Sequence, residues 1–159
     1  MFRADFIKSR KVYEQLGQYD YQNPDYTDDI TECTGVGKNG ENWVYFGQTK
    51  AGTEILDGIG IMVWERGATP ICIYSNCICE GYWKDDLRNG PCRFIFPSGD
   101  CYVGENKDNK FHGHGTQYFT NGDKYSGDFI NDKGHGKGTF YKADGTKELR
   151  EYRNGNLIK

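Results

Sequence analysis

Residues 102–124 read YVGENKDNKFHGHGTQYFTNGDK, and residues 125–147 read YSGDFINDKGHGKGTFYKADGTK. The second segment repeats the first at an offset of 23 residues, so that Tyr102 aligns with Tyr125 and Gly115 with Gly138. Matches at one fixed spacing indicate a protein built from stacked repeats. The glycine pattern also extends back to residue 79, where Cys79 stands in the tyrosine position and Cys92 in a glycine position.

The repeats set the organisation of the chain. A looser unit near 45–68 starts at Tyr45-Phe46-Gly47, and nine extra residues, Ala68–Asn76, precede the next unit. These extra residues include the apolar run ICIY, so we expect them to contact a partner or the N-terminal segment. We divide the chain into an amphipathic helix at 1–17, an acidic extended linker at 18–42 and a repeat domain at 43–159. The units of the repeat domain lie near 45–68, 79–101, 102–124 and 125–147, with a half repeat at 148–155.

Each unit is predicted to be a β-hairpin. In the unit that starts at residue 102, Tyr102–Asn106 and Gly113–Phe119 are the expected strands, and Lys107–Lys110 is the loop between them. Short strands separated by Gly, Asn and Asp turns favour an antiparallel meander. The glycines expected to allow close packing are Gly47, Gly58, Gly60, Gly81, Gly90, Gly104, Gly113, Gly115, Gly127, Gly136 and Gly138.

The pattern Tyr-x-Gly, polar stretch, Gly-x-Gly and Gly turn resembles the MORN repeat family. The resemblance covers residues 45–155 and is strongest over 102–145. It implies an all-β fold: a single-layer, twisted antiparallel sheet of hairpin repeats. It also implies a scaffold in cytoskeletal, ciliary, membrane-contact or organelle assemblies, and some members have been proposed to bind anionic phospholipid.

The N-terminal segment is predicted to contain an amphipathic helix over residues 1–17. One side of its helical wheel carries the apolar residues Phe2, Phe6, Tyr13 and Leu16, and Gly17 is the expected C-terminal end of the helix. The helix either caps or covers the protein's own sheet, or it binds a partner. Residues 18–32 carry five acidic residues and no basic one, which favours an extended linker.

Composition excludes several classes of function. The net charge is −3, whereas nucleic-acid-binding proteins usually carry a basic patch. No apolar run reaches the length of a transmembrane helix. The Gly-x-Gly pairs recur in hairpins and lack the strand–helix context of a phosphate loop. We find no catalytic arrangement outside the repeats, so we expect neither an enzyme nor a cofactor.

Histidine and cysteine positions also favour structural roles. His112 and His135 occupy one register of the repeat, so we interpret them as repeat residues and expect no zinc site. Cys77 and Cys79 are spaced Cys-x-Cys, unlike the Cys-x₂-Cys of a zinc knuckle. We expect the six cysteines to be reduced, and most of them to be small buried side chains.

We expect a structural subunit that binds other protein subunits of a large complex. The partner-binding candidates are Phe2, Phe6, Tyr13, Leu16, Trp64, Trp83, Tyr102, Tyr118 and Tyr125. An intracellular, cytoskeletal or ciliary setting is favoured by the resemblance, and a mitochondrial one comes second. The alternatives are a peripheral membrane adaptor that binds anionic lipid through its basic C-terminal end, and a regulatory module of a separate enzyme.

Overall fold

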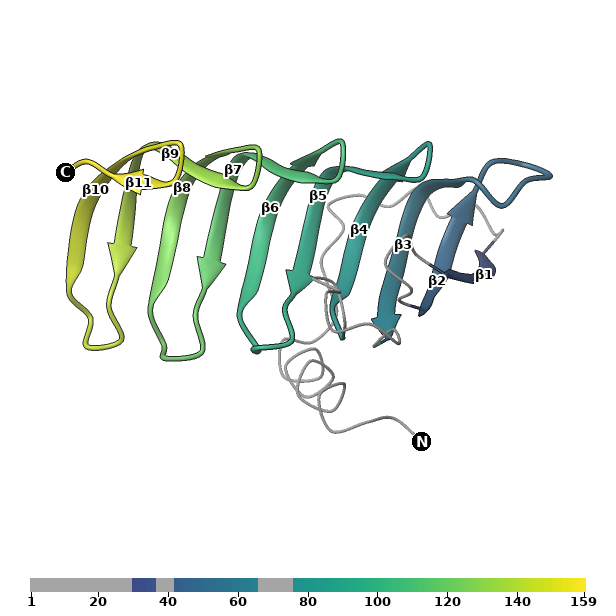
Figure 1. Cartoon of the computed structure of the whole chain (residues 1–159), viewed down its shortest axis with the longest axis horizontal. Coiled ribbons are helices and arrows are strands. Elements are labelled where there is room, and N and C mark those ends of the chain that lie inside the picture. Colours follow the sequence, from purple (N-terminus) through teal and green to yellow (C-terminus); the bar gives the residue numbers. More distant parts are fainter. Residues whose placement is uncertain (1–29, 37–41, 66–75) are drawn as a thin grey trace.

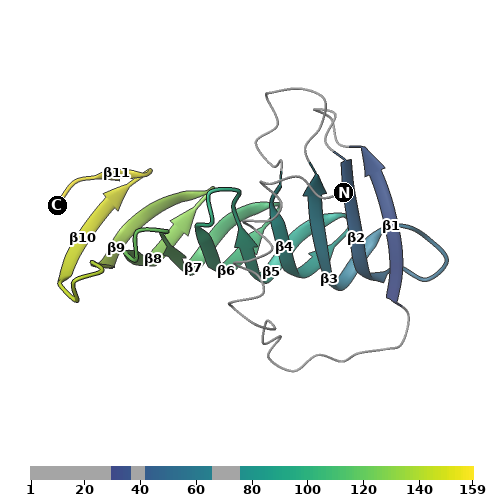
Figure 2. The same cartoon turned by 90° about the horizontal axis from the view of Figure 1, so that it is seen from below.

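The computed structural model describes residues 30–36, 42–65 and 76–159, and every regular element in them is a strand of one antiparallel sheet (Figure 1). The strands are β1 (Ile30–Val36), β2 (Asn42–Thr49), β3 (Leu56–Glu65), β4 (Ile78–Lys84), β5 (Leu87–Ile95), β6 (Cys101–Lys107), β7 (Lys110–Tyr118), β8 (Lys124–Ile130), β9 (Lys133–Tyr141), β10 (Lys147–Arg153) and β11 (Asn156–Leu157). Their order in space is their order along the chain, which confirms the predicted meander. Figure 2 shows the sheet twisting along its length.

In the part of the chain that the structure describes, four hairpins close through two-residue turns in which both residues have positive φ. This conformation matches the twist of the flanking strands, and Asn, Asp and Gly adopt it at least cost. In the β6–β7 turn, Asp108 has φ 49° and Asn109 has φ 68°. The corresponding pairs in the other three turns are Asp85/Asp86, Asn131/Asp132 and Asn154/Gly155.

The second residue of each turn also binds the preceding hairpin. The Asp132 amide donates to the Phe111 carbonyl (3.0 Å), and the Phe111 amide donates to Asp132 Oδ1 (2.8 Å). The same two-way contact joins Asn109 to Arg88 and Asp86 to Leu56. At the opposite end of the strands, Asp100 and Asp123 accept hydrogen bonds from Thr120 and Ala143. Neighbouring repeats are therefore joined at both ends of their strands.

Tyrosine rings packed on paired glycines form the repeating core. Tyr102 is fully buried, and its ring lies where a Cβ on Gly104 or Gly115 would be. Its hydroxyl donates to the Glu105 carbonyl (2.9 Å). Tyr45 covers Gly47 and Gly60 in the same way, and Tyr125 covers Gly127 and Gly138. The glycines are required at these positions because the ring fills the space of a side chain.

The sheet begins at Ile30, earlier than the repeat domain predicted from Trp43. Residues Ile30–Val36, which we placed in the extended linker, pair with β2 from Ile30↔Gln48 to Val36↔Asn42. The β6–β7 hairpin has the predicted strands, although β7 starts at Lys110 and ends at Tyr118. The predicted helix at 1–17 lies outside the described residues, as do residues 18–29 of the predicted linker and most of the insertion at 68–76.

Candidate interaction surface

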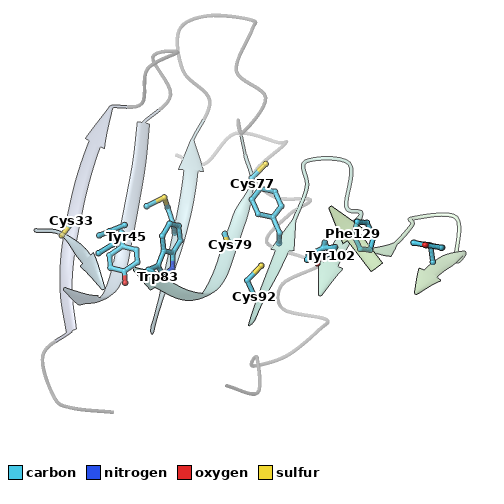
Figure 3. Packing of buried hydrophobic residues seen from close by; sticks show 12 residues of the cluster. Cys33, Tyr45, Cys77, Cys79, Trp83, Cys92, Tyr102 and Phe129 are labelled. Carbon is cyan, nitrogen blue, oxygen red and sulfur yellow. The ribbon is translucent and has the colours of Figure 1, made fainter. Parts of the chain in front are cut away.

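The two faces of the sheet differ in chemistry. Alternate residues of a strand point to opposite faces, and the register places Cys79, Phe94 and Tyr102 side by side on one face and Ile78, Ile95 and Cys101 on the other. The first face carries the main core cluster, and we call it the aromatic face. Figure 3 shows Tyr45, Trp83, Cys92, Tyr102 and Phe129 in a row across its strands.

Partly buried rings form the outer surface of the aromatic face. They pack on the buried cluster and remain accessible to solvent; they are Trp43, Trp64, Phe96, Phe111, Phe119, Phe140 and Tyr152. Several of them contact another ring of this face. Phe111 stacks on Tyr102 with ring centroids 3.8 Å apart, and Phe119 lies 6.2 Å from Phe140. Within residues 30–36, 42–65 and 76–159, these rings form a long apolar surface with no second layer over them.

The C-terminal end of the aromatic face carries a fixed charge cluster. The Arg150 guanidinium lies 3.5 Å from the Phe140 ring centroid and donates to Glu148 Oε2 (2.6 Å). Glu148 also pairs with Lys142. The Lys142 ammonium, followed by Arg150, keeps the pKa of the Glu148 carboxyl below its usual value. This arrangement positions one arginine as a flat cationic surface beside the aromatic rings.

All three tryptophans of the chain line one pocket at the other end of the aromatic face. The pocket has a volume of about 630 Å³, within the range of small-molecule sites. Its lining comes from the β2–β3 and β4–β5 hairpins and one adjacent turn: Trp43, Glu54, Ile55, Leu56, Met62, Trp64, Trp83, Asp86, Arg88 and Asn109. We call it the tryptophan pocket.

The rings of the tryptophan pocket are held in place by the sheet. Trp83 is buried, donates from Nε1 to the Gly60 carbonyl (3.3 Å), and meets Tyr45 edge to face at 5.6 Å. The Trp43 ring lies flat against Gly35 of β1, in space that a side chain at residue 35 would occupy. Trp64 packs on Phe94 with centroids 5.9 Å apart. A ligand would therefore meet rings that are already ordered.

The acidic side chains of the tryptophan pocket are exposed, and its basic side chain is buried. Glu54 and Asp86 lie exposed in its lining. Burial first, and then these two carboxylates, raise the pKa of the nearby Cys33 thiol. Arg88 is buried, stacks over Phe94 at 4.9 Å and donates to the Asn109 carbonyl. Its guanidinium is therefore held within the wall by neutral groups, whereas the two carboxylates face solvent.

A thiol pair replaces the tyrosine in the unit at 79–101. Cys79 and Cys92 are both fully buried and hydrogen-bond to each other, and Asn106 donates to the Cys92 sulfur. Burial raises the pKa of Cys79, but the bonds from Cys92 and Arg88 outweigh it and lower that pKa. Burial and the Cys79 thiol raise the pKa of Cys92. Cys79 stands in the position that tyrosine has in the other units, and Cys92 in the position of the second glycine.

The opposite face carries a buried ion pair. Arg93 Nη2 lies 2.7 Å from Glu80 Oε1, and both side chains are about 95 % or more buried, with exposures of 5 % and 2 %. Ile78, Ile95 and Cys101 form a small apolar cluster on this face. Its large exposed apolar side chains are scattered; they include Phe46 on β2, Tyr118 on β7 and Leu149 on β10.

The structure separates the sequence-predicted binding residues into different environments. Tyr102, Tyr125 and Trp83 are 0 %, 5 % and 4 % exposed and belong to the core, although Trp83 also lines the tryptophan pocket. Trp64 is partly exposed in the tryptophan pocket, and Tyr118 is 43 % exposed on the opposite face. The remaining candidates, Phe2, Phe6, Tyr13 and Leu16, lie outside the described residues.

Sequence reasoning missed Trp43, Asp86 and Arg88 as pocket residues. The aspartate carries a usable signal, because Asp86, Asn109 and Asp132 recur every 23 residues as the second turn residue. Trp43 and Trp64 carry no such signal. They become neighbours only through the pairing of β2 with β3, in which they are direct partners.

The described part of the chain contains neither a metal-binding cluster nor a membrane-spanning helix. His114 bonds to Asp128 Oδ1 (3.2 Å) and Ser126 Oγ (3.4 Å). No group of three or more His, Cys, Asp or Glu side chains in residues 30–36, 42–65 and 76–159 is placed to hold a metal ion. These residues also contain no helix long and apolar enough to cross a membrane.

A family model matches the central repeats of the chain. The family model described as MORN repeat matches residues 79–101, 102–124 and 125–147, with the boundaries that the 23-residue period predicts. No curated protein matches the chain significantly. The unit near 45–68 lies outside the matched residues, yet Tyr45 covers Gly47 and Gly60 as Tyr102 covers its glycines.

Proposed function

The chain belongs to the MORN-repeat family, and on that premise we propose that it is a non-catalytic scaffold subunit that holds other proteins within a larger assembly. Repeats of this family are in general protein- or membrane-interaction modules without catalytic activity. We propose a ciliary or other cytoskeletal assembly as its setting, with a mitochondrial complex as the second choice.

The observation that supports this proposal is the aromatic face. Among the described residues, seven partly buried aromatic side chains lie on this face, and no second layer covers them. Aromatic and arginine side chains are the residues that contribute most to protein interfaces. The rings are ordered by their packing on buried Tyr102, Phe94 and Tyr125, so binding would cost little side-chain entropy.

The test is purification of the tagged, full-length chain from its native cell at mild salt, followed by sizing and identification of the proteins that accompany it. The scaffold proposal predicts a large complex with constant stoichiometry. A chain that elutes alone, at the size of a monomer, would contradict it.

Binding of anionic phospholipid is the second candidate. Its support is the group of basic residues at the C-terminal end: Lys133, Lys137, Lys142, Lys147, Arg150 and Arg153. Acidic residues neutralise part of this group, because Glu148 pairs with Lys142 and Arg150, and Glu151 faces Lys137 across the strands. A lipid-binding surface needs clustered basic charge, which makes protein partners the better supported choice.

Vesicle sedimentation separates the two candidates. Binding to phosphatidylserine vesicles that weakens steeply with salt would support the membrane adaptor. No binding at low salt would exclude it and leave the scaffold proposal as the remaining candidate.

A further inference from the structure

We propose that the tryptophan pocket binds the cationic side chain of an arginine or lysine on a partner protein, between the indole rings and the carboxylates of Glu54 and Asp86. The inference rests on the proposed function, because it specifies which chemistry of a protein partner this part of the aromatic face recognises. It assigns the pocket a ligand class that the repeat pattern does not imply.

The aromatic walls are the first argument. A cation is attracted to the face of an aromatic ring, and tryptophan attracts it most strongly. Trp43, Trp64 and Trp83 line the same pocket, which also contains the apolar side chains of Leu56 and Met62. The long apolar stem of arginine or lysine suits such a lining, since these residues bury their stems and keep a polar end near water.

The negative charge is the second argument. Asp86 is held rigidly, because the Leu56 amide donates to its Oδ1 (2.8 Å) and the Asp86 amide donates to the Leu56 carbonyl (3.0 Å). Among the described residues, neither Glu54 nor Asp86 takes part in an ion pair, whereas neighbouring Asp85 and Asp57 are paired with Lys50. Two carboxylates at an aromatic pocket complement one positive charge.

One positive charge, that of buried Arg88, stands in the pocket lining against the two negative charges of Glu54 and Asp86. Arg88 is 4 % exposed, and its guanidinium is engaged by Phe94, the Asn109 carbonyl and the Cys79 thiol. The pKa of Tyr45, beside the pocket, is raised by burial first and then by negative charges that include Asp57 and Asp86. Asp57 and Asp86 therefore contribute negative charge on the β2–β3 side of the pocket.

The test is direct binding of N-acetyl-arginine amide to the full-length chain. All three tryptophans of the chain line the pocket, so intrinsic tryptophan fluorescence reports on this site alone. N-acetyl-citrulline amide is the matched probe, because citrulline has the shape of arginine without its charge. We expect saturable binding of the arginine probe in the millimolar range, and binding of the citrulline probe weaker by a factor of about 10.

The matched variant is Glu54→Gln with Asp86→Asn. It removes both charges, yet Asn keeps the oxygen that Leu56 needs, and Asn109 is the natural residue at this turn position one repeat later. The control is Asp108→Asn, an exposed turn residue outside the pocket lining. The double variant should weaken binding of the arginine probe at least fivefold, and the control should not.

Equal binding of the two probes, or unchanged binding by the double variant, would overturn the inference. The proposed function is judged separately, by the complex from the native cell. If that complex persists with the double variant and the probe does not bind, the inference fails and the scaffold proposal stands. If the arginine probe binds but the chain purifies as a monomer, the pocket stands as a cation site and the scaffold proposal fails.

Discussion

Replacing Gly138 by alanine tests the packing of tyrosine rings on glycines. A Cβ at residue 138 would lie 2.5 Å from the hydroxyl oxygen of Tyr125, and 2.6 Å from Cζ of the same ring. Gly134 in the same strand is the matched control, since its Cβ would lie 3.6 Å from the nearest atom, Tyr152 Cγ. Gly134 has no positive φ, so alanine fits there without backbone strain.

The two alanine substitutions are expected to change the free energy of unfolding differently. Overpacking a filled core costs about 1–3 kcal/mol, so Gly138→Ala should lower the free energy of unfolding by that amount. Gly134→Ala should be neutral or stabilise by up to about 1 kcal/mol, because alanine restricts the unfolded chain. Each kcal/mol corresponds to a change in Tm of about 2–4 °C for a protein of this size.

Thermal and urea unfolding followed by far-UV circular dichroism measure these changes. The double variant Tyr125→Ala with Gly138→Ala completes a mutant cycle. Tyr125→Ala alone should cost about 3–5 kcal/mol, and the added Gly138→Ala should then cost almost nothing, because the ring it collides with is gone. Equal stabilities of Gly138→Ala and Gly134→Ala, or additive effects in the cycle, would refute the packing argument.

Three further substitutions test other contacts. Asp132→Ala should lower the free energy of unfolding by about 0.5–1.5 kcal/mol, since the exposed Phe111 amide loses its acceptor, whereas Asp132→Asn should match the wild type in urea unfolding. Equal losses in the two variants would contradict the role of the oxygen. Cys79→Tyr and Cys92→Gly should each lower the stability of the protein. The double variant should recover about 1–3 kcal/mol of the summed loss, because it restores the tyrosine–glycine pair, and calorimetry of the mutant cycle measures this recovery. Purely additive losses would contradict the pairing of these two positions. Glu80→Ala should lower the free energy of unfolding by about 3–5 kcal/mol, because it leaves the buried charge of Arg93 without its partner. The double variant Glu80→Leu with Arg93→Leu should lose far less stability, again measured by calorimetry. A single variant as stable as the double variant would contradict the pairing.

The sequence was sufficient for the architecture because the residues that build it recur. Tyr102, Gly104 and Gly115 are one unit of a packing motif, and their spacing identifies hairpins before any coordinates. β1 was missed for the opposite reason. Its residues, ITECTGV, contain no Tyr-x-Gly pair, and the strand forms because it pairs along its length with β2.

The candidate site was less predictable, because aromatic residue type does not reveal burial. Tyr102 and Tyr125 were expected to bind partners, but each has glycines beneath it that admit its ring to the core. The tryptophan pocket depends on contacts between residues far apart in sequence. Trp83 donates a hydrogen bond to the Gly60 carbonyl of β3, and Asp86 accepts one from the Leu56 amide. These residues become neighbours because β3 pairs with β4.

The most direct test of the scaffold proposal compares the native complexes of two full-length variants. Phe119→Ser with Phe140→Ser changes two partly exposed rings of the aromatic face, and Tyr118→Ser with Leu149→Ser changes two exposed residues of the opposite face. Circular dichroism first establishes that both variants are folded. We predict that the aromatic-face variant loses the proteins that accompany the wild-type chain, while the opposite-face variant keeps them. Retention of the same proteins by both variants, or their loss only from the opposite-face variant, would contradict the assignment of the aromatic face as the docking surface.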